Sequence, residues 1–235
     1  MAFSNWGAAR RVALAALLIG GLAGCSSLPK LGPFGGGKPR PATEPTEAEL
    51  AASAEALAEQ PLVVMPNPYD EGAQSVPAAV ASRFAEGRAA LAAKRFEQAR
   101  DIFAEMAANY PLLSGPQVNL AIAKWRLGDV AGAGDAFAAA IAANRLNGDA
   151  YTQWGLMARE AGDFERAQSL YQQALDVWPH NFDAHINLGI LQDLYMGRLT
   201  DALAHYQMAA RIAGEPTREL QGWIIDLERR LAEAG

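Results

Sequence analysis

From residue 80 onward, the apolar and polar positions of the chain follow a pattern that recurs about every 34 residues. Four stretches carry the pattern: "EGRAALAAKRFEQARDIFAEM", "LAIAKWRLGDVAGAGDAFAAA", "WGLMAREAGDFERAQSLYQQA" and "LGILQDLYMGRLTDALAHYQMA". Each stretch predicts one helix, a short turn and a second helix, because apolar residues recur at helical spacing on both sides of a turn. We expect the four units at 80–113, 114–147, 148–181 and 182–214.

Small and aromatic residues mark equivalent positions in the four units. The second helix of each unit has a small residue at Ala99, Ala133, Ala167 and Ala202, and an aromatic residue four positions later at Phe103, Phe137, Tyr171 and Tyr206, with spacings of 34, 34 and 35. The first helix has its own small residue at Gly87, Ala121, Gly155 and Gly189. Small residues let two helices approach closely, and the aromatic ring fills the space beside them. Each apolar face is then buried only when units stack on one another.

This period and helix-turn-helix content resembles the tetratricopeptide repeat. Further positions agree: the turns read Gly128-Asp129, Gly162-Asp163 and Gly197-Arg198, and Pro111 and Pro179 close two second helices. The resemblance covers residues 80 to about 214. It implies an all-α fold, a right-handed superhelical solenoid of about four helix-turn-helix units.

Residues 215–235 predict a C-terminal capping helix that covers the last repeat. Leu220, Trp223, Ile224, Leu227 and Leu231 form one stripe and charged residues lie elsewhere, so a polar outer face is expected. A dimer seam is the alternative interpretation. The fourth unit has one extra residue before its turn, in "LQDLYMGRL". Its apolar cluster Leu194, Tyr195 and Met196 is expected either to pack under the capping helix or to form a second contact point.

The N-terminus predicts export and lipid attachment. Residues 1–24 have no acidic residue, and Arg10 and Arg11 precede an apolar run of 11 residues. A membrane-spanning helix needs about 20 such residues, so a signal peptide fits better. Leu22-Ala23-Gly24-Cys25 resembles the lipobox of bacterial lipoproteins, which implies cleavage before Cys25 and three acyl chains on it. Ser26, where Asp usually marks retention at the inner membrane, favours the outer membrane facing the periplasm. The alternative is a secreted protein with one unpaired thiol.

Residues 25–78 are expected to be a lipidated N-terminus and a flexible linker rich in Pro and Gly. Within them, Thr46-Glu47-Ala48-Glu49 predicts a capping box that opens a short helix to about Glu59. The apolar stretch Leu62 to Met65 is expected to pack on the folded domain; binding a partner and filling the groove of the array are the alternatives. The stretch Gly32 to Lys38 has P-loop spacing, but Pro39 follows where a metal-binding Ser or Thr is needed, so no nucleotide site is expected.

Composition argues against nucleic acid as a partner. Without residues 1–24 the chain has 18 basic and 26 acidic residues, a net charge of −8, and the basic residues are scattered. The residues also predict no metal, no cofactor and no catalytic group. His180, His185 and His205 lack the one-turn spacing of a helical zinc site, and His185 lies at a packing position. We therefore expect a protein that is not an enzyme and that has no small-molecule substrate.

In the tetratricopeptide family, the first helix of each unit lines a concave groove. By that resemblance, twelve residues are expected to face inward: Phe84, Arg88, Leu91, Val118, Ile122, Trp125, Thr152, Leu156, Arg159, Ile186, Ile190 and Asp193. Most of them are apolar, and an exposed apolar strip usually marks a protein-binding surface. Ile or Leu stands in three units where some family members use Asn to grip a carboxylate, so a helix or apolar peptide is the expected ligand.

The sequence therefore predicts a lipid-anchored, periplasm-facing adaptor that binds a protein of an envelope machine. The layout resembles pilotins and pilus-assembly lipoproteins, which escort secretin rings, and repeat proteins of TonB-type transport systems. The segments "NLGILQDLYMG" and "WIIDLERR" are most similar to the TonB-associated group. The alternative function is a regulator or docking factor for peptidoglycan enzymes.

Overall fold

The computed structural model of the chain describes residues 43–58, 62–71 and 76–234. All regular structure within these ranges is helical, which confirms the all-α prediction. The helices are α2 (Glu47–Ala58), α3 (Pro68–Glu71), α4 (Ala78–Ala92), α5 (Phe96–Asn109), α6 (Ser114–Arg126), α7 (Val130–Ala143), α8 (Gly148–Glu160), α9 (Phe164–Val177), α10 (Phe182–Leu191), the π-helix η1 (Gln192–Met196), α11 (Leu199–Ala213) and α12 (Arg218–Ala234).

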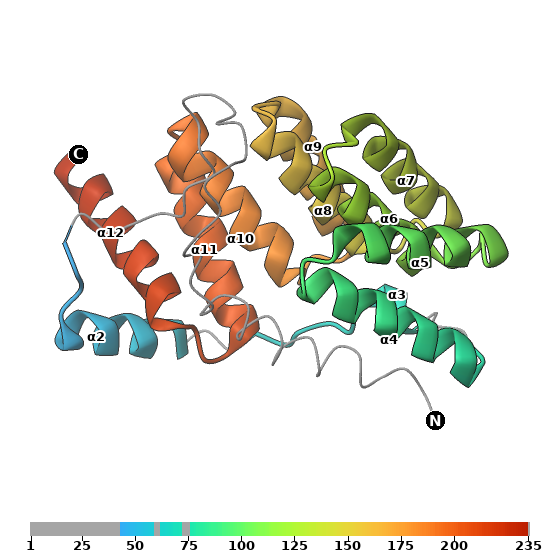
Figure 1. Cartoon of the computed structure of the whole chain (residues 1–235). Helices are drawn as coiled ribbons and strands as arrows, with labels where there is room; N and C mark the ends of the chain where they lie inside the picture. Colours follow the sequence, from blue (N-terminus) through green and yellow to red (C-terminus); the bar gives the residue numbers. More distant parts are fainter. Residues whose placement is uncertain (1–42, 59–61, 72–75, 235) are drawn as a thin grey trace.

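Helices α4 to α11 form four antiparallel pairs that stack side by side into a curved array (Figure 1). The pairs are α4 with α5, α6 with α7, α8 with α9, and α10 with α11, and each second helix also packs on the first helix of the next unit. Helix α12 then packs on α11 at the end of the array. The structure is therefore a solenoid, in which each unit contacts mainly its neighbours.

The aromatic residue of each second helix lies against the small residue of the first helix. Phe103, Phe137, Tyr171 and Tyr206 are all 0% exposed. A Cβ atom added at Gly87 or Gly155 would lie 2.6 Å from the ring of Phe103 or Tyr171, and one at Gly189 would lie closer still to Tyr206. Glycine is needed at these positions because the ring rests directly on the helix backbone, as the repeat pattern predicts.

The extra residue of the fourth unit is accommodated by η1, because a π-helix arises when one residue is inserted into an α-helix. The Tyr195 ring packs on Phe164 of the preceding unit, with 4.8 Å between ring centroids. Leu194 remains 42% exposed. The predicted apolar cluster is thus divided: Tyr195 packs backward on α9, and Leu194 faces solvent.

Helix α2 packs on α12 and α11, at the end of the array opposite to α4 (Figure 1). Its predicted capping box is confirmed: the Thr46 N–H donates to Glu49 Oε2 (2.8 Å), and the Glu49 N–H donates to Thr46 Oγ1 (3.3 Å). Leu50 is buried, and Arg218 forms an ion pair with Glu47. The prediction of a flexible linker through residue 78 is therefore corrected for residues 43–58, because these residues pack on the array.

Residues 62–71 run from this end back toward the first unit. The Met65 N–H donates to His180 Nδ1 (2.6 Å), and the Met65 carbonyl accepts from Trp178 Nε1 (2.9 Å). Farther along, the Tyr69 hydroxyl accepts a hydrogen bond from Ser114 Oγ (3.2 Å). The stretch Leu62 to Met65 packs on the folded domain as predicted, through the Met65 backbone and the partly buried Leu62 and Val64 side chains, while Val63 is 88% exposed. We call residues 43–58 and 62–71 together the N-terminal arm.

Because the N-terminal arm packs on α12, the exposed side of this capping helix differs from the prediction. In α12, the residues from Gly222 to Leu227 are all buried, including Ile225 on the side that was expected to be polar. The reason is that α12 lies between α11 and α2, so both of its sides are covered. Within the described part of the chain, none of the helices is long and apolar enough to span a membrane.

Candidate protein-binding site

Eleven of the twelve residues that were expected to line the groove lie on α4, α6, α8 and α10, and Asp193 lies on η1. Five of the twelve are buried in the array: Phe84, Val118, Thr152, Ile190 and Asp193. Phe84 packs edge-on against Phe103, and the Thr152 hydroxyl donates to the Gly148 carbonyl of its own helix. The predicted set is therefore corrected for these five residues, because side chains buried by their neighbours present no surface to a partner.

The apolar members that remain accessible form a discontinuous row, which we call the inner strip. It consists of Leu91 on α4, Ile122 and Trp125 on α6, Leu156 on α8 and Ile186 on α10, all of them partly exposed. Several are also tied to the core: Leu91, Ile122 and Trp125 pack against the cluster of the first two units, and Ile186 against that of the fourth. The inner strip offers short apolar contacts from consecutive units, which suits an extended or helical protein segment.

A cation stacks on the tryptophan of the inner strip. The Arg126 guanidinium lies 4.1 Å from the centroid of the Trp125 ring. The remaining polar members of the predicted set are Arg88, which is exposed, and Arg159, which is partly buried. The accessible surface at this face is thus a mixture of apolar patches and arginine side chains.

Beneath the third and fourth units lies a set of shielded polar atoms, which we call the Arg159 cluster. Among the described residues, Nε and Nη1 of Arg159, the hydroxyls of Tyr171 and Tyr206, and Oε1 of Gln192 are buried without a hydrogen-bond partner. Burial raises the pKa of both tyrosine hydroxyls above their usual range, and the charge of Arg159 opposes the rise in each case. Both hydroxyls are therefore uncharged at neutral pH.

Asp193 was expected to face the groove but is directed to the end of the array. Its Oδ1 accepts a hydrogen bond from Arg230 Nη1 (2.8 Å), and Asp226 Oδ2 lies 3.4 Å from the same nitrogen. Burial raises the pKa of Asp193, while the bond to Arg230 opposes the rise. The ion pair therefore joins η1 to α12 and serves the packing of the last unit.

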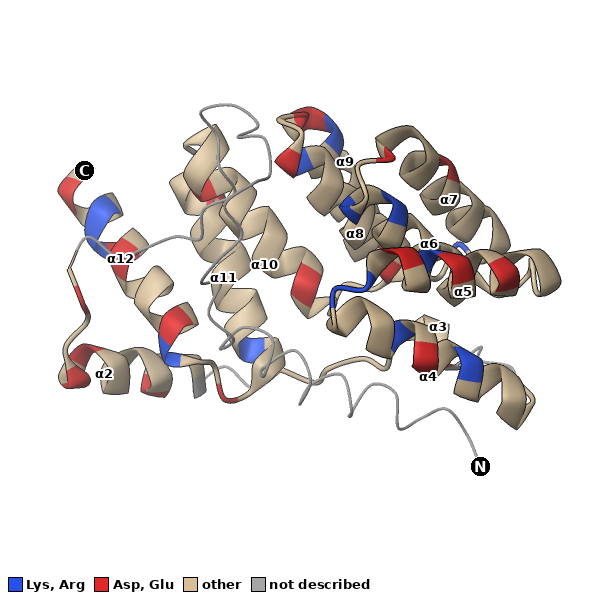
Figure 2. Ribbon diagram, in the orientation of Figure 1, with Lys and Arg blue, Asp and Glu red and all other residues tan. Residues whose placement is uncertain are grey.

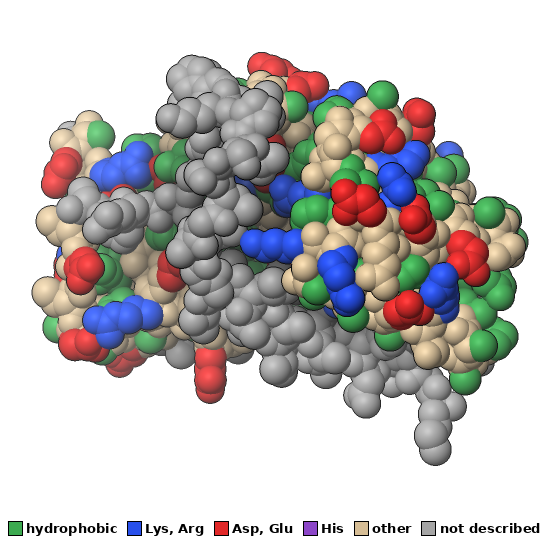
Figure 3. All heavy atoms as spheres, viewed as in Figure 1, with side chains coloured by type: hydrophobic (Ala, Val, Ile, Leu, Met, Phe, Trp, Pro, Cys, Tyr) green, Lys and Arg blue, Asp and Glu red, His purple; other side chains and the backbone are tan. Residues whose placement is uncertain are grey.

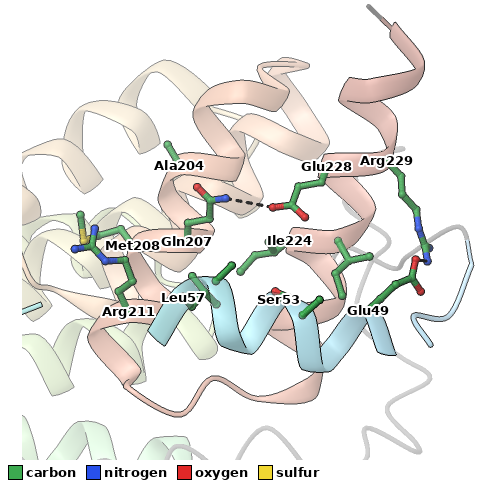
Figure 4. Close-up of a pocket in the computed structure, with 13 residues that line it drawn as sticks. Glu49, Ser53, Leu57, Ala204, Gln207, Met208, Arg211, Ile224, Glu228 and Arg229 are labelled. Atoms are coloured by element: carbon green, nitrogen blue, oxygen red, sulfur yellow. Dashed lines mark hydrogen bonds and ion pairs between the residues drawn. The ribbon is translucent and has the colours of Figure 1, made fainter. Parts of the chain in front are cut away.

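A second surface, which the sequence did not predict, is an open cleft between α2, α11 and α12 (Figure 4). It has a volume of about 480 Å³. The α2 wall consists of small side chains, with Ala52, Ser53 and Ala56 between Glu49 and Leu57. Facing it are Met208 and Gln207 of α11 and Ile224, Ile225, Glu228 and Arg229 of α12. The cleft was missed because its walls are separated by about 150 residues or more in the sequence. In the sequence, the signal for a second covered side of α12 was Ile225, an apolar residue outside the predicted stripe.

An ion pair closes one end of the cleft. Arg229 donates to Glu49 and also to the carbonyl and hydroxyl of Thr43, so a single guanidinium holds the start of the arm. The hydrogen bond from Arg229, together with those from Thr46, lowers the pKa of the Glu49 carboxyl to about 2. This end of α2 is therefore held by charge, while the middle of the helix is held by few apolar contacts.

Acidic and basic residues both occur along much of the array (Figure 2), and on the face shown in Figure 3 they are interspersed over α4 to α9. A nucleic-acid-binding surface requires clustered basic residues. Among the described residues there is also no group of three or more His, Cys, Asp and Glu side chains that could hold a metal ion.

Residues 152–216 match the model of the tetratricopeptide repeat family. No curated protein is recognisably similar to the chain in sequence. Solved structures that share its fold include the following two. The pilF structure of Pseudomonas aeruginosa is 20% identical, with a TM-score of 0.57, over 66% of this chain and 70% of that one. A thermophilic tetratricopeptide protein of Thermus thermophilus, TTC0263, is 21% identical, with a TM-score of 0.54, over 79% of this chain and 90% of that one.

The matched segment thus places residues 152–216 in the tetratricopeptide repeat family, and the array as a whole is a tetratricopeptide superhelical solenoid. Proteins of this fold generally act as scaffolds for interactions between proteins. The two accessible surfaces, the inner strip and the cleft beside α2, are accordingly the candidate binding sites.

Proposed function

We propose that the protein is a lipid-anchored adaptor of the bacterial outer membrane that faces the periplasm and holds a protein of an envelope machine. The observation that carries this proposal is the inner strip, where consecutive units offer partly exposed apolar side chains in a fold that binds proteins. The machine is a TonB-type transport system or a pilus or secretion assembly, in line with the sequence resemblances.

Anchoring follows from the lipobox Leu22-Ala23-Gly24-Cys25. Three acyl chains on Cys25 hold a protein on a bilayer durably, since two membrane signals already suffice. Replacing Cys25→Ser should leave the protein unprocessed or soluble, as seen by fractionation of cells and by the mass of the N-terminal peptide. A cleaved Cys25→Ser protein that still sediments with membranes would contradict lipid anchoring.

Charged substitutions in the inner strip test whether it binds the partner. In the double variant Ile122→Glu with Leu156→Glu, we expect recovery of cross-linked partners to fall at least about tenfold, because each new carboxylate opposes burial under an apolar ligand. Both side chains are partly exposed, so the fold should survive. Ile190 is unsuitable for this test because it is only 6% exposed.

The matched control is Ala104→Glu with Ala139→Glu, at exposed positions of the second helices α5 and α7. This control adds the same charge and should leave recovery unchanged. Equal recovery from both double variants would remove the inner strip from the proposal. Recovery of a single peptidoglycan hydrolase without any machine component would favour the alternative function as a docking factor for cell-wall enzymes.

A further inference from the structure

The cleft beside α2 lies outside the inner strip and has no part in the function proposed above. Its α2 wall is a weak cover for the helices beneath. Leu50 is the one described side chain of α2 that is buried, and Leu57 is partly buried. The positions between them that face the cleft are Ala52, Ser53 and Ala56, which are too small to reach across it.

Two ion pairs also connect α2 to α12. The Arg218 and Glu47 side chains of one pair are 66% and 81% exposed, and an exposed ion pair adds little to stability because water and salt screen it. The Arg229 and Glu49 pair is partly buried, and a carboxylate of another helix could replace Glu49 in it. Helix α2 is therefore held on α12 by contacts that a competing helix could replace.

The surface beneath α2 is suited to a helix of defined chemistry. Met208, Ile224 and Ile225 are the apolar residues along its floor and wall. Arg218 and Arg229 lie at its edges and already pair with acidic residues of α2. A helix that places carboxylates on these arginines and larger apolar side chains over the floor would fill the cleft better than α2 does.

We propose that the α11–α12 surface under α2 is a docking site for an acidic amphipathic helix of a partner protein, and that α2 occupies this site until such a helix replaces it. This is helix-in-groove recognition. Because α2 is part of the same chain, its effective concentration at the surface is high. A partner helix must therefore bind this surface more tightly than α2 does. Larger apolar side chains that fill the cleft would provide the additional binding energy.

A peptide of residues 45–58 with Ala52→Leu and Ala56→Leu serves as the probe, since leucine at these positions extends into the cleft. We expect this peptide to bind the full mature chain at least about tenfold more tightly than the peptide of native sequence, measured by fluorescence anisotropy. Met208→Glu in the protein should abolish binding, because it places a charge on the apolar wall.

Two variants of α2 within the full chain should move the affinity for this peptide in opposite directions. Leu50→Asp with Leu57→Asp removes the apolar contacts of α2 without altering α11 or α12, and should raise the affinity about tenfold or more. Ala52→Leu with Ala56→Leu in the protein itself fills the cleft from within, and should lower the affinity about tenfold or more. The inner-strip variant Ile122→Glu with Leu156→Glu should bind the peptide as the native chain does.

The proposal is overturned if the leucine peptide binds neither the native chain nor the Leu50→Asp, Leu57→Asp chain while circular dichroism shows a folded array. The same holds if both α2 variants bind the peptide with equal affinity. A dimer in sedimentation that Ala52→Leu with Ala56→Leu strengthens would identify α2 of a second copy as the occupant, and would also overturn it. A loss of the adaptor function through the inner strip would leave these outcomes unchanged.

Discussion

Lys94 occupies a turn position at which the other three units have glycine. Its φ is 57°, and Gly128, Gly162 and Gly197 have φ values of 87°, 81° and 65° at the equivalent places. A side chain in this left-handed region crowds the following carbonyl oxygen, which costs roughly 1–2 kcal/mol, whereas glycine has no Cβ to crowd it. The first unit therefore contains strain that the other three avoid.

We expect Lys94→Gly to raise the free energy of unfolding by up to about 1 kcal/mol, because the relief of strain exceeds the added freedom of the unfolded chain. Urea denaturation followed by circular dichroism measures the change. The reciprocal variant Gly128→Lys, whose Cβ would meet no atom within 4 Å, isolates the backbone effect and should destabilise the protein. A stabilised Gly128→Lys protein would show that left-handed strain is not what distinguishes these turns.

Glycine on the first helix and the aromatic residue on the second define a contact that a single methyl group can disturb. A Cβ at Gly189 would collide with the Tyr206 ring, whereas a Cβ at Gly134, inside α7, would meet nothing within 4 Å. We expect Gly189→Ala to cost about 1–3 kcal/mol by overpacking. The control Gly134→Ala should add up to about 1 kcal/mol, since alanine favours helix. Thermal unfolding of both variants measures the difference, and equal effects would contradict direct packing of ring on backbone.

At the scale of the element, two histidines join α10 to α11. His185 Nδ1 lies 2.9 Å from His205 Nδ1, and His185 Nε2 donates to the Pro179 carbonyl (2.9 Å). The contact between Nδ1 atoms is favourable only when one of them lacks a proton. Burial lowers the pKa of His185, and burial together with His185 lowers the pKa of His205 to about 4.

These shifts make stability depend on pH in a defined window. An unfolded histidine has a pKa of about 6.5, so between that pH and about 4 the unfolded chain binds a proton at His205 that the folded chain does not. The stability that depends on the uncharged His205 is therefore fully present above pH 6.5 and is lost as pH falls, by up to about 1.4 kcal/mol per pH unit. The lowered pKa of His185 acts in the same direction. His205→Asn should flatten this part of the stability curve, measured by urea denaturation at pH 7.5, 6.0 and 5.0. An unchanged slope would mean that carboxylates account for the pH dependence.

The scale of the helices also explains which parts of the structure could be predicted from the sequence. The helices of the array were predictable because each one repeats a local pattern of small and aromatic residues, and neighbouring units bury that pattern in the same way. The docking of α2 on α12 could not be predicted, because it depends on contacts such as that of Arg229 with Glu49, which are 180 residues apart in the sequence. Burial within the predicted groove was missed at Val118 and Ile190, since helical spacing identifies a face but not how far the neighbouring unit covers it.

At the scale of the whole molecule, the N-terminal arm runs from the α12 end of the array to the start of the second unit. It begins on α12 at Thr43, is held by Trp178 and His180 at the turn before the fourth unit, and reaches Ser114 at the start of the second. Thr43, the first described residue, therefore lies at the α12 end of the array, far along the solenoid from α4 (Figure 1).

If Cys25 bears the lipid anchor, the arm fixes which end of the array faces the bilayer. Thr43 lies 18 residues after Cys25, a span of no more than about 65 Å even when fully extended. A tether that ran free to residue 78 would have 53 residues and could reach about 190 Å, which would impose no orientation. With a dye at Glu233→Cys in α12, we expect stronger energy transfer to acceptors in lipid vesicles than with a dye at Ala93→Cys after α4. Cys25 is the one cysteine of the chain, so each label is unique when Cys25 is blocked by the proposed lipid. Leu50→Asp with Leu57→Asp should reduce the difference between the two labels, since it frees α2 from α12. Equal transfer from both labels in the native chain would show that the arm does not orient the array.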